Sequence, residues 1–413
     1  MYDLAIIGAG PAGIACAKQA LKKKLKVILL EKNQDFFGGT CLNFGCIPLK
    51  TLLNLSKKEK NWQKILEIKN EVVEKIKRPL LDYLTKLIDI RWGGVCFLDR
   101  NTLKVDKEII KAKNIVIACG SLAKGVEKRS NTIIAEELLK RKDLPNKILI
   151  VGAGFIGLEF ASLLNNLGKE VYLIEKEEQI LPFFGERDLV KRLRIILEGK
   201  GMKIQTNKDL FSLDLDEFEL VIFCGGRKPN IGGLGVERIG LSLTGEGFVL
   251  TDGFLRTNLE NIYACGDITG KKMLAYTAEY QASLVVKNIT EEQVEEDYSI
   301  FPECVFSLPQ IAKVGILEEE IKKKNISYRL IKSNFLKFSA SFFYQDQDGF
   351  IKVYLDENDC IIGASIISHY ACELINIFSL IIKNHLTLKD LAKSTFIHPT
   401  VSEIIPLLLK ENL

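Results

Sequence analysis

The sequence predicts an α/β fold with two domains of one βαβ type and a C-terminal α+β domain. Three observations lead to this prediction. The glycine pattern G-x-G-x-x-G occurs at residues 8–13 and again, 144 residues later, at residues 152–157. An apolar segment precedes each copy, and an acid follows the last glycine of each by 18 residues (31 − 13 and 175 − 157). From about residue 299, strand-like and helix-like patterns alternate without such glycines.

Each glycine pattern lies between a predicted strand and a predicted helix. The first follows Tyr2–Ile7 and leads to a strand that ends at Glu31, and the second leads from Lys147–Val151 to a strand that ends at Glu175. Two copies in this context predict two Rossmann-like dinucleotide-binding domains. The glycines let the backbone approach a pyrophosphate, and the helix N-terminus donates N–H groups to it. Each acid can bind ribose hydroxyls, and Glu175 should repel a 2′-phosphate, which favours NAD over NADP.

The remaining segments suggest how the chain passes between these domains. Residues 56–91 have apolar side chains at near-helical spacing, and we expect a surface helix pair interrupted at Pro79. Strand-plus-glycine segments at 114–120 and 220–226 mark crossings out of each nucleotide domain. The C-terminal part predicts a strand over 350–355 and helices that start near Ala371 and Leu388. The predicted domains are 1–143 and 227–297 (first nucleotide domain), 144–226 (second nucleotide domain) and 298–413 (C-terminal domain).

Composition excludes several classes of protein. The 413 residues are 47% hydrophobic and 27% charged, which is ordinary for globular domains. No apolar run approaches the roughly 18 residues of a membrane span, and we expect no membrane partner and a cytoplasmic location. A net charge of +4 over this length does not favour a nucleic-acid partner. With three histidines and one close cysteine pair among ten cysteines, we expect no metal site.

That pair, Cys41 and Cys46, follows the first βαβ unit closely, and a redox disulfide beside a cofactor is the direct interpretation. The segment 38–50 resembles the C-x4-C motif of the flavoprotein disulfide reductases, the family of dihydrolipoamide dehydrogenases and glutathione reductases. Residues 257–267 are similar to the second FAD segment of that family, and residues 226–230 to its junction after the nicotinamide domain. Residues 396–403 resemble its interface-domain signature, so that the resemblance extends through the whole chain.

The resemblance implies a chemical role for each member of the site. FAD would bind the first domain and NAD(H) the second. Cys46 would be the thiolate beside the flavin, and Cys41 the thiol that exchanges with substrate. His398, oriented by Glu403, would be the acid–base group and would enter from the other subunit of a homodimer. Disulfide exchange needs a thiolate attacker and a protonated leaving group, and an imidazole can serve both needs.

Two charged residues acquire a role from the same resemblance. Lys50 and Glu159 resemble the family's buried ion pair beside the flavin, although composition alone would favour two solvated side chains. The further cofactor-binding residues that the resemblance and the glycine patterns imply are Gly8, Gly10, Pro11, Ala12, Gly13, Glu31, Lys32, Gly39, Thr40, Gly120, Gly226, Gly266, Asp267 and Ala275, with Gly152, Gly154, Phe155, Ile156, Gly157 and Glu175 in the second domain.

The choice of substrate rests on finer similarities. Glu175 favours NAD, and residues 371–376 look more like the interface segment of the dihydrolipoamide dehydrogenases, which act on the lipoyl domain of a 2-oxo acid dehydrogenase or glycine-cleavage complex. Leu49, Phe155, Tyr276 and Phe396 depart from that pattern. One alternative is a glutathione-type reductase or a reductase of another small disulfide. A second, from a different class, is a non-catalytic redox-sensing or scaffold paralogue.

Overall fold

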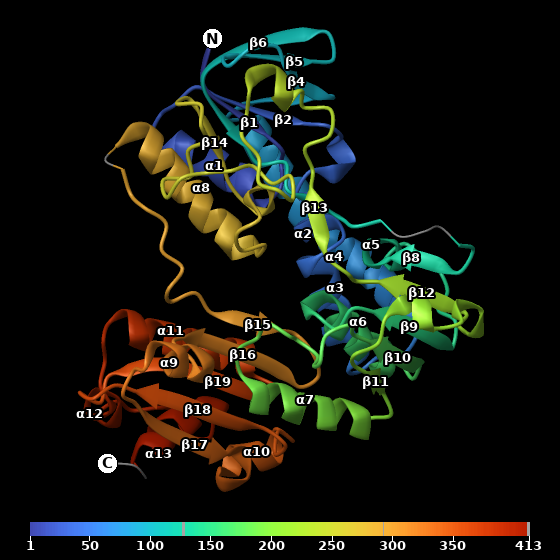
Figure 1. Ribbon diagram of the computed structural model, residues 1–413, viewed down its shortest axis with the longest axis vertical. Helices are drawn as coiled ribbons and strands as arrows, with labels where there is room; N and C mark the ends of the chain where they lie inside the picture. Colours follow the sequence, from blue (N-terminus) through green and yellow to red (C-terminus); the bar gives the residue numbers. More distant parts are fainter. Residues whose placement is uncertain (126–128, 292, 411–413) are drawn as a thin grey trace.

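The computed structural model describes residues 1–125, 129–291 and 293–410, and the predicted α/β fold is confirmed. Figure 1 shows three bodies: the first nucleotide domain at the top, the second at the lower right and the C-terminal domain at the lower left. The first sheet has the order β3-β2-β1-β6-β5-β4, and β14 pairs with β6. Its strands are β1 (Tyr2–Ile7), β2 (Val27–Glu31), β3 (Asp89–Trp92), β4 (Val95–Phe97), β5 (Thr102–Val105), β6 (Glu108–Ile117) and β14 (Ile262–Ala264).

The first sheet is parallel where it carries the glycine turn. β1 pairs in parallel with β2 and β6. Its residues Leu4–Ile7 are buried because two helices cover one face of the sheet, and β4, β5 and the segment 234–268 cover the other. Helices α1 (Pro11–Lys22) and α8 (Ala275–Thr290) pack side by side on it, which places the return segment of the chain beside its start (Figure 1). β4, β5 and β6 form an antiparallel extension.

The second sheet is wholly parallel, in the order β11-β10-β9-β12-β8. Its strands are β8 (Thr132–Ile134), β9 (Lys147–Val151), β10 (Glu170–Ile174), β11 (Lys203–Gln205) and β12 (Leu220–Phe223), and its helices include α6 (Phe155–Asn166) and α7 (Arg187–Gly199). β8 precedes residue 144, so an edge strand of this sheet comes from the range expected in the first domain. No glycine pattern accompanies this three-residue strand, and the sequence gives no signal for it. β7 (Ser121–Ala123) and β13 (Arg227–Pro229) pair where the chain crosses between the domains.

Three helices join the two nucleotide domains. They are α2 (Gly39–Asn43), α3 (Cys46–Ser56) and α4 (Trp62–Thr85). The expected interruption at Pro79 is wrong, because α4 runs through it as one helix. Pro79 cannot donate to the carbonyl of Lys75, but both residues are exposed and water can satisfy that carbonyl. α3 packs on α4 and on α6, which brings the cysteine segment against the second domain.

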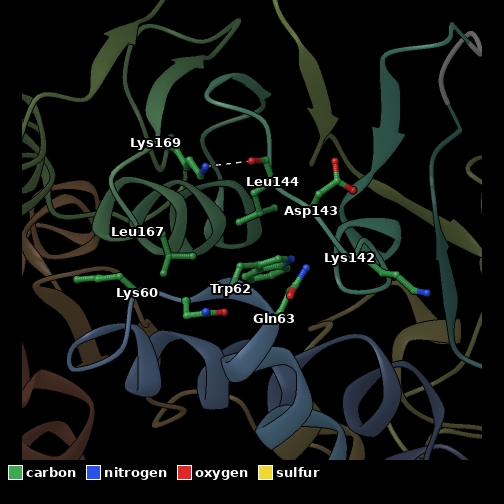
Figure 2. A pocket seen from close by; sticks show the side chains of 9 residues that line it. Lys60, Trp62, Gln63, Lys142, Asp143, Leu144, Leu167 and Lys169 are labelled. Atoms are coloured by element: carbon green, nitrogen blue, oxygen red, sulfur yellow. Dashed lines mark hydrogen bonds between the residues drawn. The ribbon is translucent and has the colours of Figure 1, made fainter.

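The start of α4 is anchored at a small polar pocket of about 300 Å³. Figure 2 shows Trp62 beneath Leu144 and Leu167 at the junction with the second domain. The Trp62 indole donates to the carbonyl of Arg141 (2.9 Å), and Lys169 donates to that of Leu144 (3.0 Å). The Trp62 bond holds the start of α4 against the segment that leads into β9, and the Lys169 bond ties that segment to the chain after α6.

The C-terminal domain is a five-stranded antiparallel sheet with helices on it, as expected. The sheet order is β15-β16-β19-β18-β17. Its elements are β15 (Glu303–Val305), β16 (Gln310–Gly315), α9 (Glu318–Lys324), β17 (Arg329–Asn334), α10 (Ser339–Phe343), β18 (Phe350–Leu355), β19 (Ile361–Ser368), α11 (Ala371–Lys383), α12 (Leu388–Ala392) and α13 (Ile404–Lys410). The predicted strand at 350–355 and the predicted helix starts at Ala371 and Leu388 are confirmed. Among the described residues, no helix has the length and apolar character to cross a membrane.

A buried lysine ties this domain to the second nucleotide domain. The Lys352 ammonium is 1% exposed and donates to carboxylates of Glu186 (2.7 Å), Asp188 (3.1 Å) and Glu318 (2.8 Å). Tyr354 also donates to Glu186 (2.7 Å). Lys352 supplies the positive charge that these three converging carboxylates require, so the cluster is an interdomain ion network.

Candidate active site

A single large cavity brings most of the predicted site residues together. Its volume is about 2220 Å³, and it is lined by both nucleotide domains, the α2–α3 segment, β15 and the start of α11. The predicted residues that line it are Gly8, Gly10, Pro11, Ala12, Glu31, Lys32, Gly39, Thr40, Cys41, Cys46, Lys50, Gly120, Phe155, Ile156, Glu159, Gly226, Gly266, Asp267 and Ala275.

The first glycine turn has the geometry that a dinucleotide needs. Gly8 has φ +105°, and a Cβ at Gly13 would lie 1.8 Å from the Gly8 carbonyl oxygen, so neither position accepts a side chain. Pro11 is the first residue of α1, which leaves the free N–H groups of the helix end at the cavity. The Glu31 carboxylate accepts a hydrogen bond from the backbone N–H of Ala9 (2.8 Å), which fixes it beside the turn. This turn fits an adenosine dinucleotide such as FAD.

The second turn repeats the first. Gly152 has φ +98°, and a Cβ at Gly157 would lie 1.8 Å from the Gly152 carbonyl oxygen. Glu175 accepts from the N–H of Ala153 (2.7 Å), as Glu31 does from Ala9. Gly152, Gly154, Gly157 and Glu175 lie outside the lining of the large cavity, whereas Phe155 does line it. The buried Glu175 carboxylate fits a ribose with free hydroxyls, which agrees with the expectation of NAD.

Asp267 lies in a polar network that the sequence did not predict. The Ser121 hydroxyl donates to the Asp267 carboxylate (2.5 Å), and the Arg227 guanidinium donates to Ser121 (2.6 Å) and to Glu136 (3.1 Å). These residues come from β7, β13 and α5 (Ala135–Leu138). The network holds Asp267 at the cavity wall. Ser121 and Glu136 belong to no short motif, so only the pairing of β7 with β13 reveals them.

Cys41 and Cys46 face each other across the turn between α2 and α3. A hydrogen bond from the Cys41 thiol, together with the nearby Lys50 ammonium, outweighs burial and lowers the pKa of Cys46 to about 7. The same bond and burial raise the pKa of Cys41. Cys46 is also the first residue of α3, where the helix dipole favours a thiolate. The reduced pair is therefore asymmetric: Cys46 is the thiol that ionises near neutral pH, and Cys41 stays protonated.

Lys50 and Glu159 form the ion pair that the sequence predicted. The Lys50 ammonium lies 2.5 Å from the Glu159 carboxylate, whose other oxygen accepts from the N–H of Phe306 (3.1 Å). The ammonium also lies 4.8 Å from the centre of the Phe306 ring. Burial would lower the pKa of Lys50, but Glu159 and Cys46 outweigh it and raise the pKa. Lys50 thus stays charged beside Cys46.

His398 and Glu403 pair with each other at a distance from this cavity. His398 Nδ1 lies 2.9 Å from Glu403 Oε1, and Glu403 Oε2 accepts from the N–H of Thr400 (2.9 Å). The hydrogen bonds from Thr400 and His398 outweigh desolvation and lower the pKa of Glu403. The imidazole is 72% exposed, and neither residue lines the cavity of its own chain. The His398 imidazole is thus held by Glu403 and faces outward from its own subunit.

Three further residues of the cavity wall were not predicted as site residues, although one of them, Tyr276, was noted from the sequence as a departure from the dihydrolipoamide dehydrogenase pattern. Tyr276 donates to the carbonyl of Pro302, and burial raises the pKa of its hydroxyl. Cys304 and Cys372 also line the cavity, from β15 and α11. They lie 68 residues apart in the sequence (372 − 304), so spacing gives no signal that they meet.

Comparisons with known proteins agree with this geometry. Residues 2–282 match the sequence profile of the pyridine nucleotide-disulphide oxidoreductases, and residues 301–408 match the dimerisation domain of the same proteins. The chain is 32% identical to the dihydrolipoyl dehydrogenase of Chlamydia pneumoniae, over 98% of this chain and 95% of the relative. It is also 32% identical to that of Bacillus subtilis, over 97% and 94%.

A solved structure is similar over the full length. The Cu(II) complex of the HOCl-induced flavoprotein disulfide reductase RclA from Escherichia coli superposes with a TM-score of 0.94 at 26% identity, covering 99% of both chains. The relatives found by sequence are thus named dihydrolipoyl dehydrogenases, whereas the relative found by structure is named a flavoprotein disulfide reductase.

Proposed function

Because this chain belongs to the pyridine nucleotide-disulphide oxidoreductase family, whose members use FAD and NAD(H), we propose that it oxidises protein-bound dihydrolipoyl groups to lipoyl groups and reduces NAD⁺. The observation that carries the proposal is the asymmetric Cys41–Cys46 pair in a cavity shared by both glycine-turn domains. FAD, when bound, supplies the two-electron relay between this pair and the nicotinamide. The residues that would hold it are Glu31, Asp267 and the glycines of the first turn.

The substrate step is a pair of disulfide exchanges. One substrate thiolate attacks Cys41 of the oxidised pair, so that a mixed disulfide forms and Cys46 leaves as a thiolate. The second substrate thiolate attacks the substrate sulfur of that mixed disulfide, closes the lipoyl ring and releases Cys41. Each attack needs a proton removed from a thiol, and His398 of the partner subunit would accept it, held by the partner's Glu403.

The pKa values support these roles, with Cys41 as the sulfur that is attacked and Cys46 as the leaving thiolate. Cys46 is the better leaving group because its thiolate is stabilised by Cys41 and Lys50. The match of residues 301–408 to a dimerisation domain supports a homodimer, in which the exposed His398 would face a partner cavity. The physiological partner would be the lipoyl domain of a 2-oxo acid dehydrogenase or glycine-cleavage complex.

A second candidate is the reduction of another small disulfide. The full-length similarity to RclA favours it, as does Tyr276 in the cavity wall, where it departs from the dihydrolipoamide dehydrogenase pattern. In this direction NADH would supply the electrons, and Cys41 would attack the substrate.

Trapping of the mixed disulfide distinguishes these candidates. In Cys46→Ser, the hydrogen bond that raises the pKa of Cys41 is altered and no resolving thiol remains, so Cys41 should hold an attacked disulfide covalently. The variant is incubated with equal concentrations of lipoamide and glutathione disulfide, and N-ethylmaleimide is added at once to cap the thiol that opened lipoamide carries and so to stop it from closing its ring again. Cys41 should then gain the mass of capped lipoamide. Cys41→Ser is the matched control. Predominant glutathionylation of Cys41 would favour the second candidate and overturn the first.

A further inference from the structure

A second pair of thiols meets in the wall of the same cavity. Cys304 lies in β15 and Cys372 is the second residue of α11, which packs on β15. Their side chains lie close enough to interact electrostatically. Both line the cavity, although Cys372 itself is only 7% exposed. The function proposed above uses neither residue.

The backbone holds both thiols in place. Cys304 pairs with Ala312 of β16 in the antiparallel ladder, and the backbone N–H of Cys372 donates to the side chain of Gln310 (3.0 Å) in that same strand. The two sulfurs are thus fixed by one rigid sheet and by the helix that covers it. A disulfide requires sulfurs at about 2.05 Å, so these two neighbouring thiols must approach each other to close.

Burial makes the two thiols unequal. Burial, with the interaction with Cys304 adding to it, raises the pKa of Cys372. Cys372 is therefore the thiol that stays protonated. The Lys50 ammonium lies near enough to both sulfurs to interact with them electrostatically. Cys304 is also the more exposed of the two.

We propose that Cys304 and Cys372 form a second redox site, which a hydroperoxide that enters the cavity closes to a disulfide. With hydrogen peroxide, the Cys304 thiolate attacks one oxygen, so that an S–O bond forms and the O–O bond breaks. The hydroxide that leaves takes up the proton that the Cys304 thiol has lost, and a sulfenic acid and one water result. The Cys372 thiol then attacks the sulfenic sulfur, so that an S–S bond forms and a second water leaves with its proton. The peroxide is reduced by two electrons, and the two thiols are oxidised by two.

The molecule contains a matched control for this site. Cys16 and Cys265 also meet, with sulfurs 3.7 Å apart, but both are fully buried and neither lines the cavity. The two pairs have the same chemistry and differ in access. Closure that depends on the cavity should therefore occur at Cys304–Cys372 and not at Cys16–Cys265 while the protein is folded.

The test is a peptide map of the holoenzyme after hydrogen peroxide treatment, with free thiols alkylated and no reductant added. We expect a cross-linked peptide that joins Cys304 to Cys372, the loss of two alkylatable thiols per chain, and the recovery of both after dithiothreitol. The Cys41–Cys46 disulfide does not interfere, because no lysine or arginine separates these two residues and trypsin leaves them in one peptide. Substrate turnover is not measured, so the result is independent of the proposed function.

Three variants define the outcome. Cys304→Ser and Cys372→Ser should each abolish the cross-link, and Cys372→Ser should leave a sulfenic acid at Cys304 that a 1,3-dione reagent traps. Cys360→Ser, which removes a cysteine of the same domain outside the cavity, should retain the cross-link. Absence of the cross-link in the wild-type protein would overturn the inference, as would equal closure of Cys16–Cys265.

Discussion

The ammonium of Lys50 lies 2.5 Å from the carboxylate of Glu159, and this pair joins α3 beside the cysteines to α6 of the second nucleotide domain. Both charges act on Cys46, with opposite signs: Lys50 lowers the pKa of that thiol, and Glu159 raises it. The pair therefore couples the second domain to the thiol electrostatically as well as by packing.

The first prediction concerns the ionisation of the reduced pair. Because the pKa of Cys46 is about 7, its alkylation by iodoacetamide should be slow below that pH and accelerate as the pH rises through it. Cys41, whose pKa is raised, should remain unlabelled over the same range. Peptide mapping of the reduced protein after brief labelling at several pH values measures both. Equal labelling of the two cysteines would contradict the asymmetry.

The second prediction uses the ion pair as an electrostatic probe. Lys50→Met should move the pH midpoint of Cys46 alkylation upward, toward the ordinary cysteine range, because a positive charge is lost. Glu159→Gln should move it downward, because a negative charge is lost. Lys58→Met, on the exposed end of the same segment, is the control and should leave the midpoint in place. Shifts of the same sign in both variants would indicate a purely structural role for the pair.

The third prediction concerns nucleotide choice. Glu175→Ala removes the carboxylate that opposes a 2′-phosphate, so the ratio of NADPH to NADH dissociation constants should fall by about tenfold, or ~1.4 kcal/mol. Titration of the holoenzyme with each nucleotide, followed by nucleotide fluorescence, gives the two constants without turnover. Glu178→Ala changes an exposed acid three residues on and should not alter the ratio. An unchanged ratio in Glu175→Ala would place the selection elsewhere.

The fourth prediction separates the two half-reactions. If His398 of the partner subunit accepts the substrate proton, His398→Ala should slow oxidation of a dithiol substrate by about 10²- to 10⁴-fold. Reduction of the protein by NADH, which needs no thiol proton transfer from substrate, should keep its rate in a stopped-flow experiment. His385→Ala is the control for loss of an imidazole. An equal loss in both half-reactions would exclude the assigned role.

The fifth prediction concerns stability. Lys352→Ala leaves the Glu186 carboxylate buried without its cation, and it should lower the free energy of unfolding by about 3–5 kcal/mol. Lys332→Ala removes an exposed partner of Asp188 that also lies 4.3 Å from the centre of the Phe350 ring, and it should cost about 1 kcal/mol. Urea denaturation followed by circular dichroism compares them. A similar small cost for both would show that the network does not hold the domains together.

Much of the fold follows from the sequence because its signals are local. A glycine turn between a buried strand and a helix leaves a fixed pattern, so both βαβ units and the acids that bind Ala9 and Ala153 could be found by spacing. The strand at 350–355 and the helices that start at Ala371 and Leu388 likewise have local periodic patterns of apolar residues. The interruption predicted at Pro79 was wrong because a helix tolerates proline where water can reach the freed carbonyl, and the sequence does not show that exposure.

The parts that escaped prediction are contacts between distant segments. Ser121 and Arg227 meet because β7 pairs with β13 at the crossing between domains, and Arg227 then reaches Glu136 of α5. Cys304 and Cys372 meet only because α11 packs on β15. Lys50 and Glu159 also meet from distant segments. The resemblance to a family in which the pair recurs predicts their contact, and no spacing in the sequence does.

NAD⁺-dependent oxidation of dihydrolipoamide by the purified flavoprotein, measured beside NADH- and NADPH-driven reduction of glutathione disulfide, tests the proposed function most directly. We predict turnover with dihydrolipoamide and NAD⁺, loss of that turnover in Cys46→Ser, and little reduction of glutathione disulfide with either nucleotide. Bound FAD with no dihydrolipoamide turnover, or an unchanged rate in Cys46→Ser, would contradict it.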